Sequence, residues 1–407
     1  MTHLKKEWVQ LAGLFLGLRC IYSLVGAVAG VGIDPHQINN PIYQAVAATL
    51  HYDKFSQLFV NVWFRWDTGW FLKIAAFGYG AQDCSTAFMP LYPWLIRGVS
   101  YLTGGNYLLA ALLISNLACL LTLILLYEVA LREGLLAEAA SRAVISFLFL
   151  PTAFFLYAAY SESLYFALLL AAWLLAKQRN WLVSGILAAL ATLCRVQGIL
   201  LTIILLWMFL VNCANAAGNK PLEQVKRVVG QLTSSKGWQT ISAALKRPAW
   251  LGVVLPAVSY LSYSLYLRFS GLGSIQGALE NCWGISTVSP WKGFGLFLQR
   301  LFTTPRVAID YIDLALLAAM LVLLLVGLRR IDPALSIYSW LTLATFFMRG
   351  AQPHLLESFG RYLLALFPVF LILGNLHSRT LRLGLWMASL GLQIVLLYVF
   401  LNFGWVA

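Results

Sequence analysis

Long apolar stretches follow one another along almost the whole chain, separated by short groups of charged residues or of Gly and Pro. A stretch of roughly 20 apolar residues has the length that a helix needs to cross the hydrocarbon core of a membrane. No repeat period is visible. The pattern predicts about eleven helical segments, near residues 8–32, 106–131, 143–158, 162–177, 181–194, 197–213, 249–269, 310–328, 334–348, 362–376 and 383–404. We therefore expect an all-α polytopic membrane protein, with residues 1–407 as a single integral-membrane domain.

The composition also favours a membrane protein. Apolar residues make up 61% of the sequence and charged residues 11%, against about 45–50% and about 25% in soluble proteins. These values exclude a disordered chain, a soluble enzyme and a small secreted module held by disulfides. The net charge of +13 would suggest nucleic acid for a soluble protein. In a membrane protein the basic residues instead determine which loops face the cytoplasm, so we expect no nucleic-acid partner.

The basic residues assign the connecting loops to two sides of the membrane. Many cluster in short loops, as the positive-inside rule requires of cytoplasmic loops, while others are scattered over long ones. We expect the N-terminus and loop 214–248 in the cytoplasm, the latter as a basic linker against anionic lipid. Segments 33–105 and 270–309 are then outer loops, and an odd number of crossings puts the C-terminus outside. Their aromatic residues at helical spacing suit interfacial helices or an aromatic belt.

Two apolar runs are interrupted by polar residues. Tyr160-Ser161-Glu162-Ser163 divides the first run and Cys194-Arg195-Val196-Gln197-Gly198 divides the second. Turns at these points bring Glu162 and Arg195 to the same depth on the outer side. An intramembrane charge costs roughly 2.5 kcal/mol or more unless it is paired or hydrated, which makes both residues candidates for a functional site. A purely structural ion pair is the alternative, and interrupted helices also occur at transporter sites.

Asp67 lies in the aromatic segment FRWDTGWFLKIAAFGYG of the first outer loop. In a continuous helix over 54–77 its carboxylate would share an apolar face with neighbouring aromatic residues. If the helix breaks at Thr68-Gly69, Asp67 becomes a cap at its start. A carboxylate among aromatic rings at the membrane surface suits the general base of a sugar transfer, because aromatic faces pack on sugars while the carboxylate takes a hydroxyl proton.

The cysteines and acidic residues give little sign of a metal site. The six cysteines contain no CxxC pair, and neither a DxD motif nor a His/Cys cluster with ligand spacing occurs. We therefore expect no metal and no other cofactor. Cys84 and Cys282 both fall in expected outer loops, so they form either a disulfide or two buried thiols.

Five motifs occur in an order that resembles the PIG-V family, whose eukaryotic members add the second mannose of glycosylphosphatidylinositol anchors. They are RWD followed by an aromatic helix and GY, then FMPLYP, PTAFFLYAAYSESLYFALL, CRVQGILL and SFGRYLLALFPVF. The resemblance covers most of the first 210 residues and returns near residue 360. It implies a GT-C fold, and an inverting membrane glycosyltransferase that takes its sugar from a polyprenyl phosphate on the outer or lumenal face.

The resemblance also implies roles for individual residues. Asp67 stands at the acidic position of RWD and is the expected base, whereas Asp83 matches no family position firmly. Gln197 departs from the common RxNG-like form, which has Asn. Arg361 in SFGRY combines a guanidinium with an expected helix N-terminus, both favourable to phosphate, although it could instead snorkel to lipid headgroups. The expected donor-binding residues are Arg65, Glu162, Arg195, Gln197, Arg361 and Tyr362, and the expected aromatic contacts are Trp66, Trp70, Tyr92 and Tyr160. His354 is not included.

The sequence thus predicts a membrane glycosyltransferase of the mannosyl type. The expected partners are a polyprenyl- or dolichyl-phosphate-linked donor, a glycolipid or lipid-linked acceptor and the lipid bilayer. A transporter or flippase of a lipid-linked sugar is the alternative, and a structural subunit of a glycosylation complex is a third. We expect a bacterial inner membrane, or the ER membrane in a eukaryote, with an extracytoplasmic active site. The sugar, the acceptor and the oligomeric state stay open.

Overall fold

The computed structural model describes residues 2–29, 41–81, 83–217, 220–246, 248–350 and 358–406, and these are largely helical. Apart from one isolated bridge between Thr287 and Arg349, no strand forms in these ranges.

The α-helices of the first half are α1 (Thr2–Ala29), α2 (Pro41–Ala47), α3 (Asp67–Phe77), α4 (Leu91–Ser100), α5 (Tyr107–Arg132), α6 (Ala137–Leu148), α7 (Glu162–Lys177), α8 (Trp181–Cys194) and α9 (Leu201–Cys213). Those of the second half are α10 (Pro221–Thr233), α11 (Ser235–Leu245), α12 (Leu251–Phe269), α13 (Ile275–Trp283), α14 (Pro290–Thr303), α15 (Ala308–Gly327), α16 (Pro333–Phe346), α17 (Phe359–Tyr362), α18 (Pro368–Gly374) and α19 (Arg379–Leu401). Shorter turns are η2 (Ser56–Val60), η3 (Asn61–Trp63), η4 (Ser85–Ala87), η5 (Tyr101–Thr103), η6 (Ala153–Leu156), η7 (Val196–Leu200), η8 (Pro248–Trp250) and η9 (Leu363–Leu366).

The described helices confirm a multi-pass membrane protein. Six of them are long and apolar enough to cross a membrane, namely Lys6–Ala29, Tyr107–Arg132, Val196–Cys213, Pro248–Phe269, Ala308–Gly327 and Arg379–Leu401. The other five predicted segments also coincide with helical structure, but in shorter pieces. The segment predicted near 362–376, for example, is built from η9 and α18. The number of eleven crossings stays a prediction.

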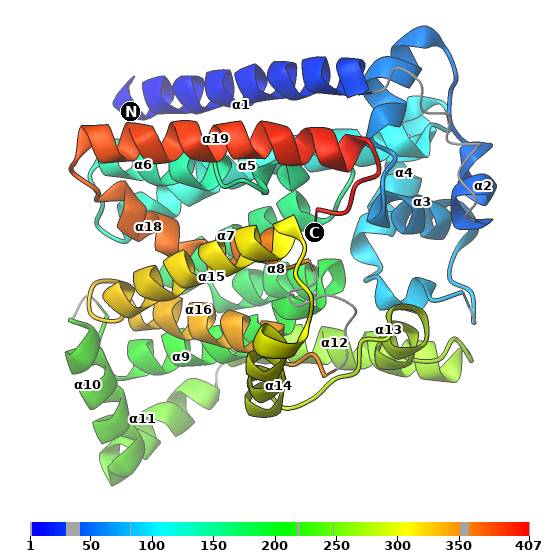
Figure 1. Cartoon of the computed structure of the whole chain (residues 1–407). Coiled ribbons are helices and arrows are strands. Elements are labelled where there is room, and N and C mark those ends of the chain that lie inside the picture. Colours follow the sequence, from blue (N-terminus) through cyan, green and yellow to red (C-terminus); the bar gives the residue numbers. More distant parts are fainter. Residues whose placement is uncertain are drawn as a thin grey trace.

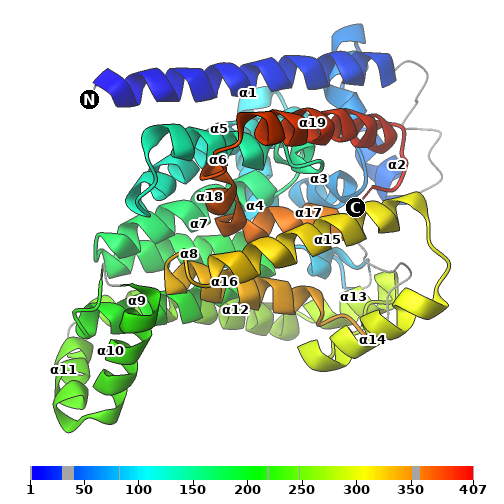
Figure 2. The same cartoon turned by 60° about the vertical axis from the view of Figure 1, so that its left-hand side comes forward.

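The long helices lie side by side, and shorter helices gather at the two ends of this bundle (Figure 1). Helices α2, α3 and α13 lie at one end, which we call the α3 end. Helices α10 and α11 lie at the other, the α10 end, and the view in Figure 2 shows the same separation. Helix α1 starts at the α10 end, whereas α19 finishes at the α3 end.

Buried polar side chains and small residues join the long helices. The Tyr22 hydroxyl of α1 donates to Gln393 Oε1 of α19 at 2.6 Å, and Gln393 Nε2 donates to the carbonyls of Leu148 and Leu150. These bonds satisfy a glutamine amide that would otherwise be costly in an apolar interior. Helices α8 and α12 approach closely at two glycines, because a Cβ on Gly185 would lie 2.0 Å from the Gly252 carbonyl oxygen.

Loop 214–248 differs from the expected linker. Its described part folds into helices α10 and α11. Leu222, Val225 and Val229 are exposed on α10, and their spacing makes one apolar stripe on that helix. The amphipathic repeat explains why this basic segment is helical.

Candidate active site

An unusual backbone turn positions Asp67 at the start of α3. Trp66 has a φ of 48°, a conformation that costs about 1–3 kcal/mol for a bulky residue unless surrounding contacts hold it. The Tyr43 hydroxyl donates to the Trp66 carbonyl at 2.9 Å, and the Trp66 indole packs edge-on against Trp405. The turn ends the preceding helical segment, so that α3 begins at Asp67.

The break excludes a continuous helix over 54–77 and lies just before Asp67, slightly earlier than the Thr68-Gly69 break considered from the sequence. The Asp67 N–H donates to the Tyr160 hydroxyl at 3.2 Å. The Asp67 side chain is 27% exposed, and it pairs with an arginine from a distant segment. Asp67 thus occupies the first turn of α3.

The two predicted interruptions form as expected. Helix α7 begins at Glu162, and α8 ends at Cys194, after which Arg195 is extended. Arg195 Nη1 lies 2.7 Å from Glu162 Oε1 and donates to the Ser161 hydroxyl at 3.2 Å. Glu162 and Arg195 therefore form the ion pair that the sequence left open as an alternative, and the Glu162 side chain is only 3% exposed.

Arg361 joins both carboxylates. Its Nη1 donates to Asp67 Oδ2 at 2.6 Å, and its Nε lies 3.2 Å from Glu162 Oε1. The guanidinium also lies over the Tyr160 ring at 5.3 Å, a cation–π contact. At 8% side-chain exposure, Arg361 is enclosed by these partners.

The local structure around Arg361 corrects one expectation. Arg361 is the third residue of the four-residue helix α17, and a 3₁₀ turn follows. It therefore does not lie at the N-terminus of a long helix, and no helix-end dipole of useful length acts there. Ser358, with a φ of 58°, starts this short helix.

Three arginines surround the Tyr362 ring. The guanidinium carbons of Arg349, Arg361 and Arg195 lie 5.0, 5.2 and 5.6 Å from its centroid. Arg361 Nη2 also donates to the Tyr362 hydroxyl at 3.3 Å. Three guanidinium groups thus lie close to one aromatic ring.

A cavity of about 190 Å³ opens beside these charges. It is lined both by polar and charged residues and by aromatic and aliphatic residues. The polar lining comprises Asp67, Ser161, Arg195, Gln197, Arg349, Ser358 and Arg361, and the apolar lining includes Phe71, Phe88, Met89, Ile275, Leu279, Trp283, Tyr362 and Trp405. One cavity thus combines a carboxylate, several guanidinium groups and aromatic faces.

The apolar wall is held by a covalent link between the two predicted outer loops. Cys84 and Cys282 form a disulfide, which resolves the alternative left open by the sequence. Trp283, next to Cys282, packs against Trp70 with ring centroids 5.6 Å apart, and Trp70 stacks on Phe88. The disulfide and these rings fix α13 against the first outer loop. Trp70 itself does not line the cavity but packs behind Phe88 and Trp283, which do.

Two of the predicted site residues lie elsewhere. Arg65 is buried, and its Nε donates to the Leu401 carbonyl at 2.7 Å while its guanidinium lies over the Phe403 ring. Arg65 therefore stabilises the end of α19 and does not line the cavity. The Tyr92 hydroxyl is bonded to Ala111 and Ser115 in the core. Arg65 and Tyr92 are excluded from the cavity for the same reason. Each forms hydrogen bonds with buried backbone carbonyls, so neither side chain is free to contact a substrate.

Asp83 also lies outside the cavity lining, where it pairs with Lys73. Burial raises its pKa, but bonds from Lys73 and Ser85 outweigh burial and hold the pKa below its ordinary value. Among the described residues no group of three His, Cys, Asp or Glu side chains could hold a metal ion. His354 lies outside the described residues.

Sequence reasoning missed Arg349, Trp405 and Asp313. Asp313 is buried in α15, and its Oδ1 would be 2.8 Å from a Cβ placed on Gly360, so it packs directly behind α17. An acid within a predicted span is the signal that could have revealed it. Arg349 and Trp405 stand near the ends of apolar segments, where interfacial residues are common, and carry no comparable signal.

The structure is similar to two oligosaccharyltransferase structures from Archaeoglobus fulgidus. One is tethered with an acceptor peptide (14% identity, TM-score 0.43, covering 96% of this chain and 55% of that chain). The other is AglB in complex with an inhibitory peptide and a dolichol-phosphate (13% identity, TM-score 0.44, covering 96% and 56%). The chain spans about half the length of these proteins.

No curated protein matches the sequence significantly. A family model described as Mannosyltransferase (PIG-V) matches residues 20–220, just under half of the chain. The matched region contains Asp67, Glu162 and Arg195, whereas Arg361 lies beyond it. Residues 20–220 of this chain are thus similar to the PIG-V mannosyltransferases.

Proposed function

We propose that this membrane glycosyltransferase moves a mannose-type sugar from a polyprenyl- or dolichyl-phosphate donor to a hydroxyl of a glycolipid or lipid-linked acceptor. The reaction takes place in the cavity beside Asp67, with a GT-C-type arrangement as the family resemblance implies. The single observation that carries the proposal is the partly exposed carboxylate of Asp67, held by Arg361 at 2.6 Å in a cavity lined by further arginines.

The charges around the cavity suit this donor. Arg195, Arg349 and Arg361 bring three guanidinium groups to the cavity, close to the carboxylates of Asp67 and Glu162. A polyprenyl phosphosugar is a phosphodiester with one negative charge. Its leaving group is a phosphate monoester, which carries more negative charge. Arginine is well suited to hold both, because its planar fork donates two parallel hydrogen bonds to phosphate oxygens.

In this reaction Asp67 acts as the base, and the arginines bind the phosphate. Arg361 occupies Asp67 Oδ2, while no hydrogen bond to Oδ1 is seen from the part of the chain that the structure describes. Oδ1 accepts the proton of the acceptor hydroxyl as its oxygen attacks the anomeric carbon. The bond from that carbon to the phosphate oxygen breaks, and its electron pair stays on the phosphate, next to Arg195 and Arg349. One displacement inverts the anomeric centre, and no metal is needed.

The cavity's location supports an extracytoplasmic active site. The Cys84–Cys282 disulfide lies in its wall, and disulfides persist in oxidising compartments. The opposite end of the bundle carries the short basic loops expected in the cytoplasm.

A transfer assay with purified protein tests the proposal. The protein is incubated with radiolabelled polyprenyl-phosphate mannose and lipids extracted from its native membrane. We expect label to move into a new lipid product, and Asp67→Asn to abolish most of this transfer. Movement of the donor across proteoliposome membranes without any new product would overturn the proposal in favour of a flippase.

A further inference from the structure

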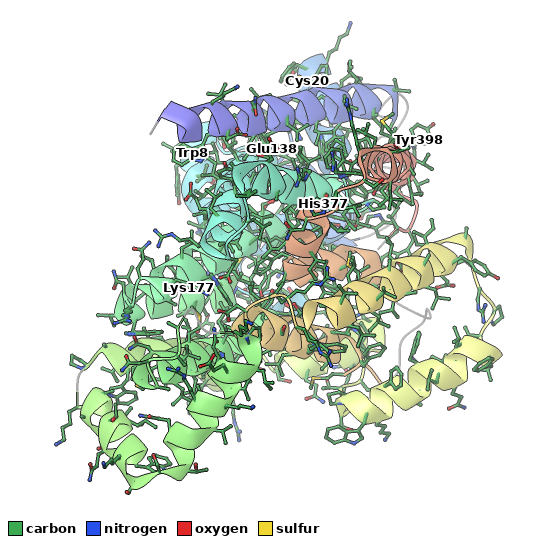
Figure 3. The ribbon with its side chains drawn as sticks, turned by 90° about the vertical axis from the view of Figure 1, so that its left-hand side faces the viewer. Trp8, Cys20, Glu138, Lys177, His377 and Tyr398 are labelled. Carbon is green, nitrogen blue, oxygen red and sulfur yellow. A yellow bond between two sulfur atoms is a disulfide. The ribbon has the colours of Figure 1, made fainter. Side chains whose placement is uncertain are left out.

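A second and larger cavity lies at the α10 end of the bundle. Its volume is about 470 Å³, and five parts of the chain form it: the end of α5, the α7–α8 turn, the end of α9, the start of α10 and the α15–α16 turn. We call it the α10-end cavity. Its lining comprises Arg132, Glu133, Gly134, Ala176, Lys177, Arg179, Trp181, Trp207, Met208, Val211, Asn212, Ala217, Pro221, Gln224, Arg330, Ile331 and Asp332. Figure 3 views this end of the molecule, with Lys177 labelled.

The cations of this cavity exceed its carboxylates. Lys177 lies 2.9 Å from both Glu133 and Asp332, so both carboxylates already share one ammonium. The three remaining cations are arginines, one at the end of α5 and two in the turns α7–α8 and α15–α16, and none forms an ion pair within the described ranges. They are Arg132, Arg179 and Arg330. Three guanidinium groups without a carboxylate partner around one cavity favour an anion.

The cavity also offers an unused donor and an apolar wall. Trp207 lines it, and the buried Trp207 Nε1 has no hydrogen-bond partner among the described residues. A buried indole N–H usually finds a partner, so this atom suits an acceptor brought by a ligand. Trp181, Met208 and Val211 add apolar surface beside it. The combination suits an anion that is joined to an apolar group.

The amphipathic hairpin of α10 and α11 indicates where this cavity opens. Pro221 of α10 lines the cavity, while Leu222 and Val229 of the same helix are exposed. Trp238 of α11 is also exposed. A basic amphipathic hairpin with exposed apolar residues lies in the membrane interface, attracted by anionic lipid. The hairpin lies at the end of the bundle away from α3 (Figures 1 and 2), which puts the cavity at the depth of lipid headgroups.

We infer that the α10-end cavity binds the phosphate group of an anionic membrane lipid. Arg132, Arg179 and Arg330 hold the phosphate, Trp207 Nε1 donates a further hydrogen bond, and the apolar wall contacts the start of the acyl chains. The site is independent of the sugar-transfer cavity at the α3 end. Free inorganic phosphate offers the same oxygen atoms, so the experiment must separate the two sources.

Native mass spectrometry of the detergent-purified full chain tests this site. Phosphatidylglycerol, phosphatidylcholine and inorganic phosphate are each titrated onto wild type and onto the triple variant R132Q/R179Q/R330Q. We expect wild type to bind phosphatidylglycerol more tightly than phosphatidylcholine. The triple variant should lose about tenfold or more of this affinity. Because all three side chains are exposed, the variant should keep its fold.

A matched control removes the same charge from the same end of the molecule. K226Q/K236Q/K246Q changes three exposed lysines of α10, α11 and the residue that follows α11, none of which lines the cavity. Its affinity for phosphatidylglycerol should stay within about threefold of wild type, as expected for screened surface charges. Trp207→Phe, which keeps the ring but removes the donor, should weaken binding several-fold.

Two outcomes would overturn the inference. An equal loss in both triple variants would show that general surface charge, and not the cavity, attracts the lipid. Arginine-dependent binding of inorganic phosphate, without preference for phosphatidylglycerol over phosphatidylcholine, would show that the cavity serves a soluble anion.

Discussion

Arg361 Nη1 lies 2.6 Å from Asp67 Oδ2, although 294 residues separate the two in the chain. The same guanidinium contacts Glu162 through Nε, so one side chain orders two carboxylates from two other elements. An Arg held between two carboxylates fixes the orientation of the candidate base. This relationship gives Arg361 a role in orienting Asp67 that its sequence motif alone does not reveal.

Asp67→Asn should lower turnover by about 10²–10⁴-fold, because the amide cannot accept the proton of the acceptor hydroxyl. The side chain keeps its size and one oxygen for Arg361, so folding should change little. The measurement is the initial rate with polyprenyl-phosphate mannose at saturating donor, together with the thermal unfolding midpoint.

Asp83→Asn is the matched control, since Asp83 is also an acid of segment 33–105 but pairs with Lys73 outside the cavity lining. It should retain turnover within a few-fold of wild type. If Asp67→Asn turns over as fast as Asp83→Asn, Asp67 is not the base.

The sequence predicted the helical breaks at Glu162 and Arg195 correctly. The physical reason is local, because a polar cluster inside an apolar run cannot continue a helix through lipid without a partner. Each break is therefore visible in the residues that form it. The expected equal depth of the two turns allowed an ion pair between Glu162 and Arg195, which the sequence left open as an alternative.

The conformation around Asp67 could not be predicted in the same way. The φ of Trp66 depends on Tyr43 and on the C-terminal Trp405, and no local pattern reports such distant contacts. Arg65 shows the opposite case. Its place in the RWD motif predicted a donor-binding role, but its guanidinium instead donates a hydrogen bond to the Leu401 carbonyl at the end of α19.

Loss of the Cys84–Cys282 disulfide should lower transfer activity, because it frees α13 and with it Leu279 and Trp283 of the cavity wall. We expect Cys84→Ser and Cys282→Ser each to lower turnover several-fold, and treatment of wild type with a membrane-permeant reductant to do the same. The assay compares rates before and after reduction.

Cys20→Ser is the control for this test, since Cys20 is a free, exposed cysteine of α1. It should behave as wild type and stay sensitive to the reductant, while the two disulfide variants should no longer respond to it. A wild-type rate in Cys84→Ser would show that α13 stays in place without the covalent link.

Chelation should leave activity unchanged. In the proposed reaction arginines compensate the phosphate charge, and the leaving group departs as a phosphate monoester without a nucleotide, so no Mg²⁺ or Mn²⁺ is required. The measurement is the transfer rate with and without EDTA. Activity that EDTA abolishes and Mn²⁺ restores would contradict this expectation and direct the search for ligands to Asp67, Asp83 and Glu162.

Arg361→Lys separates positioning of Asp67 from binding of the donor phosphate. A lysine ammonium is a point charge on a flexible stem and cannot replace a planar fork that contacts two carboxylates. If Arg361 orients Asp67, kcat should fall by about 10–100-fold, since misplacing a catalytic group by about 1 Å can cost about 10²-fold. The donor KM should change by less than about threefold.

Arg195→Lys provides the comparison, because Arg195 lines the cavity without touching Asp67 and contacts Glu162 instead. This variant should raise the donor KM more than it lowers kcat. Both constants are measured in detergent and again in nanodiscs, so that a general effect of the lipid surface appears in both variants. A raised donor KM with unchanged kcat in Arg361→Lys would assign the phosphate to Arg361, as its sequence motif suggested. Wild-type values of both constants would indicate that Arg361 only reaches toward lipid headgroups, where lysine serves equally well.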